Sequence, residues 1–292
     1  MRVKTMCIIG AGTMGTGIAQ VAAQAGIRVY LLDTYEDAIP RSRELLAKSL
    51  QGGIEREKIT HQQAEEVRAL VSWETTYERL ADADWVIEAV FEDLEVKREV
   101  LRQAADLVRE NAAVASNTST LPIRDLAGSF GRPEYFLGMH FFNPAPAMKL
   151  VEIIPGEKTL PAVTEAAIAL CERMGKVPKV ALDIPGFVVN RVFAAVLAAA
   201  IELWATGAEP EAIDSAIELG LGHKMGPLAT ADLVGLDVAL ALLRSLHEQT
   251  GHPRFEAPEE FVALVESGKL GRKTGEGFYQ YLEGGAMTEA AQ

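Results

Sequence analysis

The feature that most constrains the fold is the glycine pattern GAGTMG at residues 10–15, which stands between an apolar run and a helical segment. The apolar run at 3–9 stops at Gly10, and residues 14–25 can form a helix. A second β-type run, RVYLLD, follows at 28–33, so the start of the chain spells one β-α-β unit. A G-x-G-x-x-G pattern in that context is typical of a domain that binds a dinucleotide.

The residues of this loop have different predicted roles. Gly10 makes the tight turn, Gly12 lets a pyrophosphate approach the backbone, and Gly15 permits close packing of the helix on the strand. Thr13 and Met14 complete the predicted cofactor loop, whose helix N-terminus would face the phosphates. A glycine-rich turn without a ligand is the alternative, which the flanking strand and helix disfavour.

Asp33 predicts which dinucleotide is bound. It ends the second strand, eighteen residues after Gly15, where a carboxylate would accept a hydrogen bond from the 2′-hydroxyl of the adenine ribose. The same negative charge would repel a 2′-phosphate. The sequence therefore predicts NAD, rather than NADP, as the cofactor.

Strand and helix patterns alternate up to about residue 184. Charged helical sequence fills most of 36–70, with QGG at 51–53 as its expected break. The later β-type runs lie at 84–90, 112–116, 135–142, 149–154 and 176–182. This alternation predicts an α/β fold with a doubly wound, mostly parallel sheet.

The pattern changes after DIPGF at 183–187, because no further strand is expected there. Helical patterns follow at 188–205, 210–219, 232–250 and 258–267. The sequence therefore predicts a Rossmann-type NAD-binding domain over 1–184 and a smaller all-α domain over 185–292. The apolar face of 192–204 is either a homodimer surface or internal core.

Composition excludes several classes of partner. The formal net charge of −13 argues against nucleic acid, since phosphate binding needs a basic surface. Two cysteines, Cys7 and Cys171, are too few for a disulfide framework or a metal cluster, so a reducing cytoplasm is expected. The uncharged stretch from Thr5 to Ile27 is interrupted by five glycines, and the Ala-rich run at 192–201 is too short to span a bilayer. We therefore expect no membrane partner.

Polar groups follow the carboxyl ends of several predicted strands, which is where ligands bind in open α/β sheets. Glu92 and Lys97 follow one strand, and Asn117 and Ser119 follow the next. A solvated ion pair at a helix start is the alternative for the first two. A helix N-cap within SNTS is the alternative for the others.

One His and one Glu stand in otherwise apolar strands on either side of a proline-rich turn, in HFFNPAPAMKLVEII. A hairpin centred on Pro146 would place His140 directly opposite Glu152, at contact distance on one face. A buried carboxylate needs such a partner, because desolvating its charge is costly. It would fix the tautomer of the imidazole and raise the basicity of its other nitrogen, as in a general base. A satisfied structural pair is the alternative.

The assembled motifs resemble those of the 3-hydroxyacyl-CoA dehydrogenase family over nearly the whole chain. IIGAGTMG is similar to the family's NAD fingerprint, and SNTST with HFFNPAPAMKLVEI to its catalytic core. DIPGFVVNR, MGPLATADLVGLD and GRKTGEGFY resemble signatures of its helical domain. The resemblance implies reversible, NAD-dependent oxidation of a 3-hydroxyacyl-CoA to the 3-oxoacyl-CoA, as in fatty-acid β-oxidation. A short chain such as 3-hydroxybutyryl-CoA and a homodimer are expected.

The resemblance also implies roles for single residues. His140 would be the general base and Glu152 its orienting carboxylate. Ser119 and Asn190 would hold the substrate oxygens and the nicotinamide. Further residues of the NAD site would be Glu92, Lys97, Asn117, Ser119 and Asn143. Candidates for CoA contacts on the charged helical segment, against a solvated helical face, are Ser49, Arg56 and Lys58.

Two other functions stay open. One is an NAD-dependent dehydrogenase of a free hydroxy acid, such as a sugar acid of the L-gulonate type. The other is a non-catalytic NAD-binding structural protein, which the loss of any of four residues would have favoured: Ser119, His140, Glu152 or Asn190.

Overall fold

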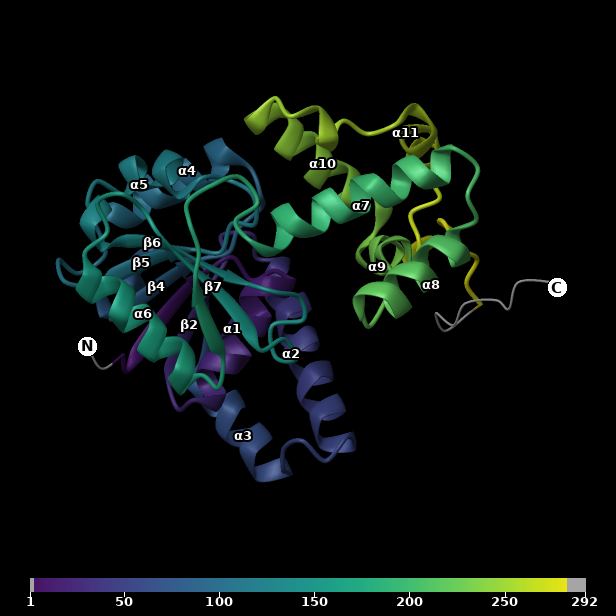
Figure 1. The fold of residues 1–292 in the computed structure, drawn as a ribbon. Helices are drawn as coiled ribbons and strands as arrows, with labels where there is room; N and C mark the ends of the chain where they lie inside the picture. The colour runs from purple at the N-terminus through teal and green to yellow at the C-terminus, as the bar shows by residue number, and fades with distance from the viewer. Residues whose placement is uncertain (1–2, 283–292) are drawn as a thin grey trace. The chain divides into compact units, whose positions relative to one another are not determined.

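The structure is a computed structural model that describes residues 3–282. Its contacts form two compact units, Met1–Ile184 and Pro185–Gln292 (Figure 1). The division falls within DIPGF, where strand patterns give way to helical ones.

The first unit is built on one eight-stranded sheet in the order β3-β2-β1-β4-β5-β6-β7-β8. Its strands are β1 (Thr5–Ile9), β2 (Arg28–Leu32), β3 (Val71–Glu74), β4 (Trp85–Glu88), β5 (Ala113–Ser116), β6 (Phe136–Phe141), β7 (Leu150–Pro155) and β8 (Val177–Val180). Neighbours are parallel except for β6 and β7, which form an antiparallel pair. The order reverses between β1 and β4, so a crevice forms at the carboxyl ends of these two strands. The predicted Rossmann-type doubly wound sheet is confirmed.

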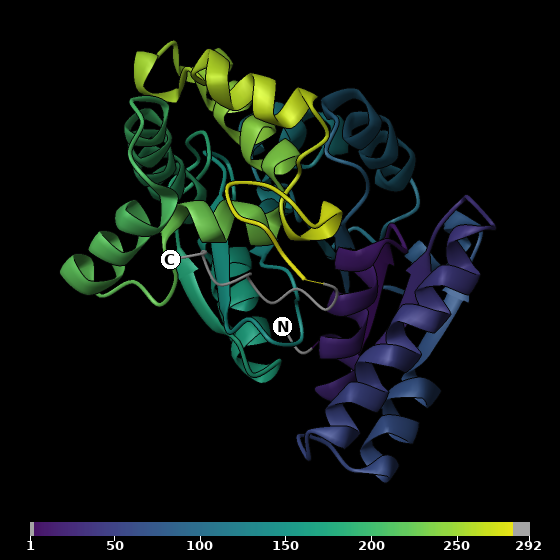
Figure 2. The ribbon, with the colours of Figure 1, turned by 90° about the vertical axis from the view of Figure 1, so that its right-hand side faces the viewer.

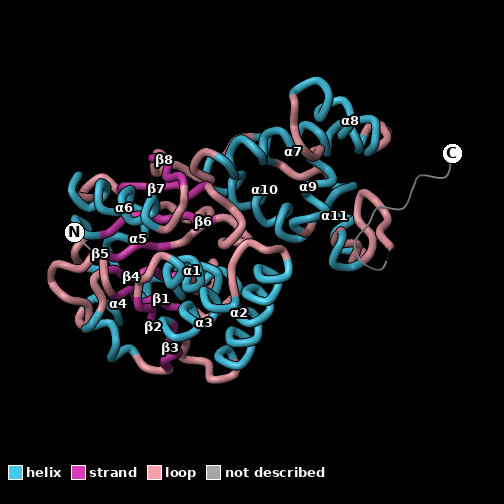
Figure 3. The backbone as a smooth tube through the Cα atoms, turned by 90° about the horizontal axis from the view of Figure 1, so that it is seen from below, coloured by secondary structure: helices cyan, strands magenta, loops and turns pink. Residues whose placement is uncertain are grey.

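Helices cover both faces of this sheet (Figure 3). One face carries α1 (Thr13–Gln24), α2 (Ala38–Glu55), α3 (His61–Leu70) and α6 (Pro161–Arg173), whose buried side chains join one apolar cluster with the strands. The other face carries α4 (Leu94–Ala105) and α5 (Ile123–Phe130). Because side chains alternate along a strand, Leu137 joins the first cluster, while Phe136 lies against Phe130 of α5 with ring centroids 6.1 Å apart.

The helical segment at 36–70 differs from the prediction. Its break lies at 56–60, not at 51–53, because α2 continues to Glu55 before the chain turns into α3 (Figure 2). Thr60 caps α3 through a capping box with Gln63. Gly53 is buried, and a Cβ there would lie 3.1 Å from Ile59, so this glycine serves close packing and does not end the helix.

The strand β3 was not predicted. It follows α3 directly, at the edge of the sheet, and only Val71 of its four residues is buried. A half-exposed edge strand of this length has too little alternation to be distinguished from the end of a helix.

The second unit is helical in its described residues, with only isolated β-bridges between Gly271 and Gln280. Its helices are α7 (Val189–Ala205), α8 (Pro210–Leu221), α9 (Pro227–Val234), α10 (Leu236–Thr250) and α11 (Glu259–Glu266). The single helix predicted at 232–250 is wrong, because Gly235 adopts φ 109° and separates α9 from α10. Within the described residues, no helix is long and apolar enough to cross a membrane.

Two buried carboxylates hold the later motifs of this unit together. Asp232 accepts hydrogen bonds from the backbone amides of Phe278 and Tyr279, at 3.0 Å each. Asp214 accepts from the amides of Leu228 and Ala229, at 2.9 and 2.8 Å, and from the hydroxyl of Tyr279 at 2.8 Å. The segments MGPLATADLVGLD and GRKTGEGFY therefore have a structural explanation within the helical unit.

Candidate active site

The glycine loop joins β1 to α1 at the point where the strand order reverses. Gly10 has φ 107°, and a Cβ there would lie 2.5 Å from the carbonyl oxygen of Ala89. A Cβ at Gly15 would lie 1.8 Å from the carbonyl oxygen of Gly10. Gly12, the N-cap of α1, would have nothing within 4 Å of a Cβ. Only glycine fits at positions 10 and 15, while Gly12 leaves space for ligand atoms beside the amides of the helix N-terminus.

A cleft of about 1020 Å³ lies along this edge of the sheet. Its lining includes Gly10, Gly12, Thr13, Asp33, Tyr35, Val90 and Phe91. The two carboxylate oxygens of Asp33 accept from the amides of Ala11, at 2.8 Å, and Tyr35, at 3.0 Å, which holds the carboxylate beside the loop. Each oxygen has a second lone pair that can accept a ribose hydroxyl. Met14 does not line the cleft; it packs against the core.

Glu92 and Lys97 belong to one charge cluster in which Lys97 is buried and the Glu92 side chain is 34% exposed, so the alternative of a solvated pair does not hold for Lys97. The Lys97 ammonium, 1% exposed, lies 3.3 Å from Glu92 Oε2. Glu92 Oε1 accepts from the amide of Ser119 at 2.7 Å and the hydroxyl of Thr118 at 2.6 Å. Burial disfavours the ionised form of Glu92, but the charge of Lys97 and these hydrogen bonds outweigh burial and lower its pKa.

Sequence reasoning missed Glu88, the third member of this cluster. It ends β4, is fully buried, and accepts from the Lys97 ammonium at 2.7 Å. The signal that could have identified it is a lone acid in the apolar run VIEAV. The same signal had singled out Glu152 in LVEII.

The predicted hairpin of β6 and β7 is confirmed in its register. His140 pairs directly with Glu152, and the distance from His140 Nδ1 to Glu152 Oε2 is 2.8 Å. Both side chains are buried, at 4% and 1% exposure. Because a carboxylate only accepts, Nδ1 carries the hydrogen, and Nε2 is the nitrogen that can take up a proton.

Three further predicted residues follow the strands β5 and β6: Asn117, Ser119 and Asn143. The side-chain oxygen of Asn117 accepts from the amide of Phe141 at 2.9 Å, so Asn117 ties the end of β5 to the strand that carries His140. Ser119 is half-buried in the loop after β5. Asn143 is exposed in the turn between β6 and β7.

The three candidates for CoA contacts lie on α2 and in the turn that follows it. Ser49 is on α2, Arg56 is the C-cap of that helix, and Lys58 follows in the turn before α3. Arg56 and Lys58 are exposed, and none of the three lines the cleft. Asn190 belongs to the second unit, in the first turn of α7.

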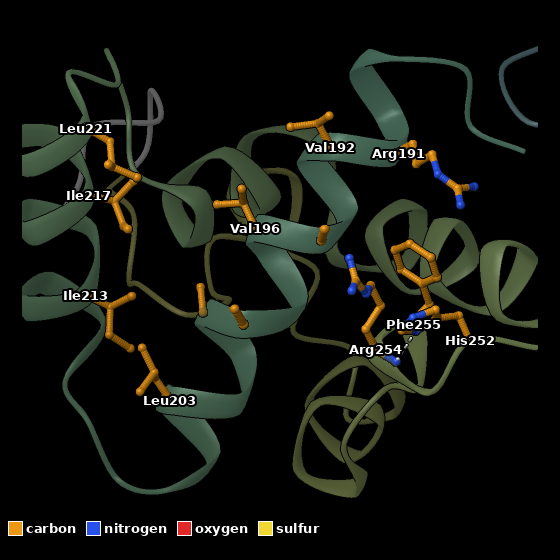
Figure 4. Close-up of a pocket in the computed structure, with 13 residues that line it drawn as sticks. Arg191, Val192, Val196, Leu203, Ile213, Ile217, Leu221, His252, Arg254 and Phe255 are labelled. Atoms are coloured by element: carbon orange, nitrogen blue, oxygen red, sulfur yellow. Dashed lines mark hydrogen bonds between the residues drawn. The ribbon is translucent and has the colours of Figure 1, made fainter. Parts of the chain in front are cut away.

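The described part of the second unit has its own cavity, of about 750 Å³, between α7 and α8 (Figure 4). Apolar side chains from both helices line it, with basic residues at one end: Val192, Val196, Leu203, Ile213, Ile217, Leu221, Arg191, His252 and Arg254. Three of the apolar ones are strongly exposed, Val192 at 60%, Leu203 at 53% and Leu221 at 66%. Exposed apolar surface of this kind is typical of an interface or a ligand site.

The sheet, the switch point and the glycine loop define a class, the dinucleotide-dependent oxidoreductases with a Rossmann-type domain. The chain belongs to the 3-hydroxyacyl-CoA dehydrogenase family: the family's NAD binding domain matches residues 5–184 and its C-terminal domain matches residues 186–281. The protein is therefore an NAD-dependent oxidoreductase, as the sequence resemblance predicted.

Known relatives resemble the chain over almost its full length. A probable 3-hydroxybutyryl-CoA dehydrogenase from Deinococcus radiodurans is 42% identical over 275 residues, covering 94% of this chain and 99% of the relative. The crystal structure of (S)-3-hydroxybutyryl-CoA dehydrogenase from Ralstonia eutropha has a TM-score of 0.91 at 40% identity, covering 96% of this chain and 100% of that one. A diketoreductase that acts on dicarbonyl compounds has a TM-score of 0.85 at 29% identity, covering 96% and 100%.

Proposed function

We propose that the protein oxidises a short-chain 3-hydroxyacyl-CoA, such as 3-hydroxybutyryl-CoA, reversibly to the 3-oxoacyl-CoA. The observation that carries this proposal is the buried pair of His140 and Glu152, joined at 2.8 Å within a member of this family. The similarity to 3-hydroxybutyryl-CoA dehydrogenases over more than nine tenths of the chain supports the short chain.

In this reaction His140 acts as the general base. Its Nε2 takes the proton of the 3-hydroxyl group, and the Glu152 carboxylate stabilises the imidazolium that forms. Bound NAD⁺ supplies the acceptor for the hydride from C3. The proton on His140 and the transferred hydride together account for both hydrogens lost by the substrate. Ser119 and Asn190 would hold the substrate oxygens and the nicotinamide.

The NAD site follows from the cleft. The open face of Gly12 and the adjoining amides of α1, with Gly10, Thr13 and Gly15, would receive the pyrophosphate. Asp33 would bind the adenine ribose. Six further residues, which do not line the cleft, are proposed for this site on the family resemblance: Met14, Glu92, Lys97, Asn117, Ser119 and Asn143.

The assignment of Asp33 predicts the cofactor preference. A carboxylate beside a 2′-phosphate costs several kcal/mol, so NAD should bind at least about 100-fold more tightly than NADP. Replacing Asp33→Ser together with Thr34→Arg should lower the ratio of the NAD affinity to the NADP affinity by about tenfold or more. Titration of the protein with each cofactor measures both affinities. The control Glu36→Ser, on the same loop but outside the cleft lining, should leave the ratio unchanged. Equal affinity for NADP in the wild-type protein would contradict the role of Asp33.

One assay tests the proposed substrate. The protein should consume NADH rapidly with acetoacetyl-CoA and far more slowly with free acetoacetate. Equal rates would favour a dehydrogenase of a free hydroxy acid. NADH binding without turnover of any 3-oxo compound would favour a non-catalytic NAD-binding protein.

We also propose that the first unit binds the cofactor and that the helical unit contributes substrate binding and a homodimer surface. The exposed apolar side chains between α7 and α8 support this surface. A monomeric mass in light scattering would contradict the homodimer surface.

The two free, buried cysteines of the described residues are consistent with a cytoplasmic location. The acidic net charge argues against nucleic acid as a partner.

A further inference from the structure

Glu88 is the most deeply buried acidic side chain in the described residues, and the proposed mechanism does not use it. Its Oε1 accepts from the Lys97 ammonium and the amide of Val90, at 2.7 Å each. Its Oε2 accepts from the Ser116 hydroxyl at 2.6 Å. Burying a charge is costly, and these three hydrogen bonds compensate the carboxylate fully within the protein.

Two routes lead from Glu88 to the loop at 117–120. Through Lys97 the first route reaches Glu92, which accepts from the amides of Ser119 and Thr120 at 2.7 and 3.0 Å. The second route is shorter, because the Ser116 hydroxyl accepts from the amide of Thr118 at 3.2 Å. All these contacts converge on one short loop, the one that carries Ser119.

The ion pair of Glu88 and Lys97 is buried, while Glu92 is partly exposed. A buried ion pair adds little stability by itself, since apolar side chains of similar volume are often as stabilising. What the cluster provides is a fixed position for backbone amides that have no strand or helix to hold them. It also fixes Val90, which lines the cofactor cleft. The polar contacts of the cluster therefore reach two parts of the proposed site: the loop that carries Ser119, and Val90 in the cofactor cleft.

We propose that Glu88 is a positioning residue, which acts through Lys97 and Glu92 to hold Ser119 in the geometry that binds the nicotinamide and the substrate. This inference rests on the proposed function, because the role of Ser119 is part of it. Glu88 itself would touch neither the cofactor nor the substrate.

The variant Glu88→Gln removes the charge and keeps the shape. The new amide can still accept from Lys97 and donate to the Ser116 hydroxyl, which can act in either sense. Lys97 then has Glu92 as its one remaining carboxylate, and Glu92 moves toward it, away from the amide of Ser119. We expect NADH to bind about tenfold more weakly, the usual effect of losing one charge-assisted hydrogen bond.

The decisive measurement is a double-mutant cycle on NADH affinity. If Glu88 acts through the loop, Glu88→Gln combined with Ser119→Ala should bind NADH within about twofold of the weaker single variant. If the two substitutions acted independently, their losses of NADH affinity would multiply in the double variant, and this result would overturn the proposal. It would also fall if Ser119→Ala left NADH binding unchanged, since there would then be nothing for Glu88 to position.

The matched control is Asp214→Asn, which changes a buried carboxylate of the second unit that also accepts from two amides and one hydroxyl. Its effect should multiply with that of Ser119→Ala. If Glu88→Gln fails to fold, Ser116→Ala removes the second route and should show the same non-additivity. NADH affinity does not depend on the hydroxy substrate, so a wrong substrate assignment and a wrong role for Glu88 give different results.

Discussion

Replacing His140→Ala should lower kcat by about 10² to 10⁴-fold, the usual cost of removing a general base. The reason is that no other group would take the hydroxyl proton from its position in β6. The affinity for NADH should change little, because His140 is not among the proposed cofactor contacts. Steady-state kinetics with acetoacetyl-CoA and a separate NADH titration measure the two effects independently.

Glu152→Gln should also lower kcat, by a smaller factor than His140→Ala, and should leave the affinity for NADH little changed. Gln can still contact Nδ1 at the position of the carboxylate, but it does not stabilise the imidazolium by charge. The double variant should be no slower than about the slower single variant, because the two side chains act as one unit. Ile153→Val is the control, because Ile153 is buried in the same strand and pairs with Met139. Additive losses in the double variant, or normal turnover in His140→Ala, would make this pair purely structural.

The elements that the sequence predicted well have strong local signals. The strand and helix on either side of the glycine loop, and the hairpin centred on Pro146, follow from short patterns whose chemistry has few alternatives. The register that pairs His140 with Glu152 was predictable because a buried carboxylate needs a partner and the proline-rich turn limits where that partner lies.

The parts that were not predicted depend on residues distant in the sequence. A solvated pair stays open for Glu92 and Lys97 in the sequence, because nothing near them indicates that Lys97 is buried beside Glu88 or that the loop after β5 contacts Glu92. The sequence predicted that the helix breaks at Gly53, but this glycine lies within α2, where it allows close packing against Ile59. Tertiary contacts of this kind leave no periodic pattern in the sequence.

The second large effect concerns the CoA part of the substrate. Replacing Arg56→Ala and Lys58→Ala together should raise KM for acetoacetyl-CoA by about a hundredfold or more, since two hydrogen bonds to phosphate are lost and each costs about 1.5 to 3 kcal/mol. Both cations are exposed at the turn after α2, where they are accessible to an anionic ligand. Ser49 precedes Arg56 by seven residues, two helical turns, and so lies on the same face.

A truncated substrate separates this effect from general damage. The N-acetylcysteamine thioester keeps the reacting carbon and the thioester but lacks the nucleotide phosphates, so the double variant should handle it almost as well as wild type. The wild-type enzyme itself should show a higher KM and a lower kcat with the truncated substrate, because binding energy from remote groups contributes to orientation at C3.

The matched control replaces two other exposed cations of the same helical pair, Lys48→Ala on α2 and Arg68→Ala on α3, which contact Glu44 and Glu65 within their own helices. This control should affect the two substrates alike. The difference between substrates seen with the Arg56 and Lys58 variant should shrink as salt rises, because exposed charge contacts are screened within about 10 Å at 0.1 M ionic strength. An equal loss with both substrates would place the CoA phosphates elsewhere, while a wild-type enzyme indifferent to truncation would remove the CoA requirement and leave a free hydroxy acid as the substrate.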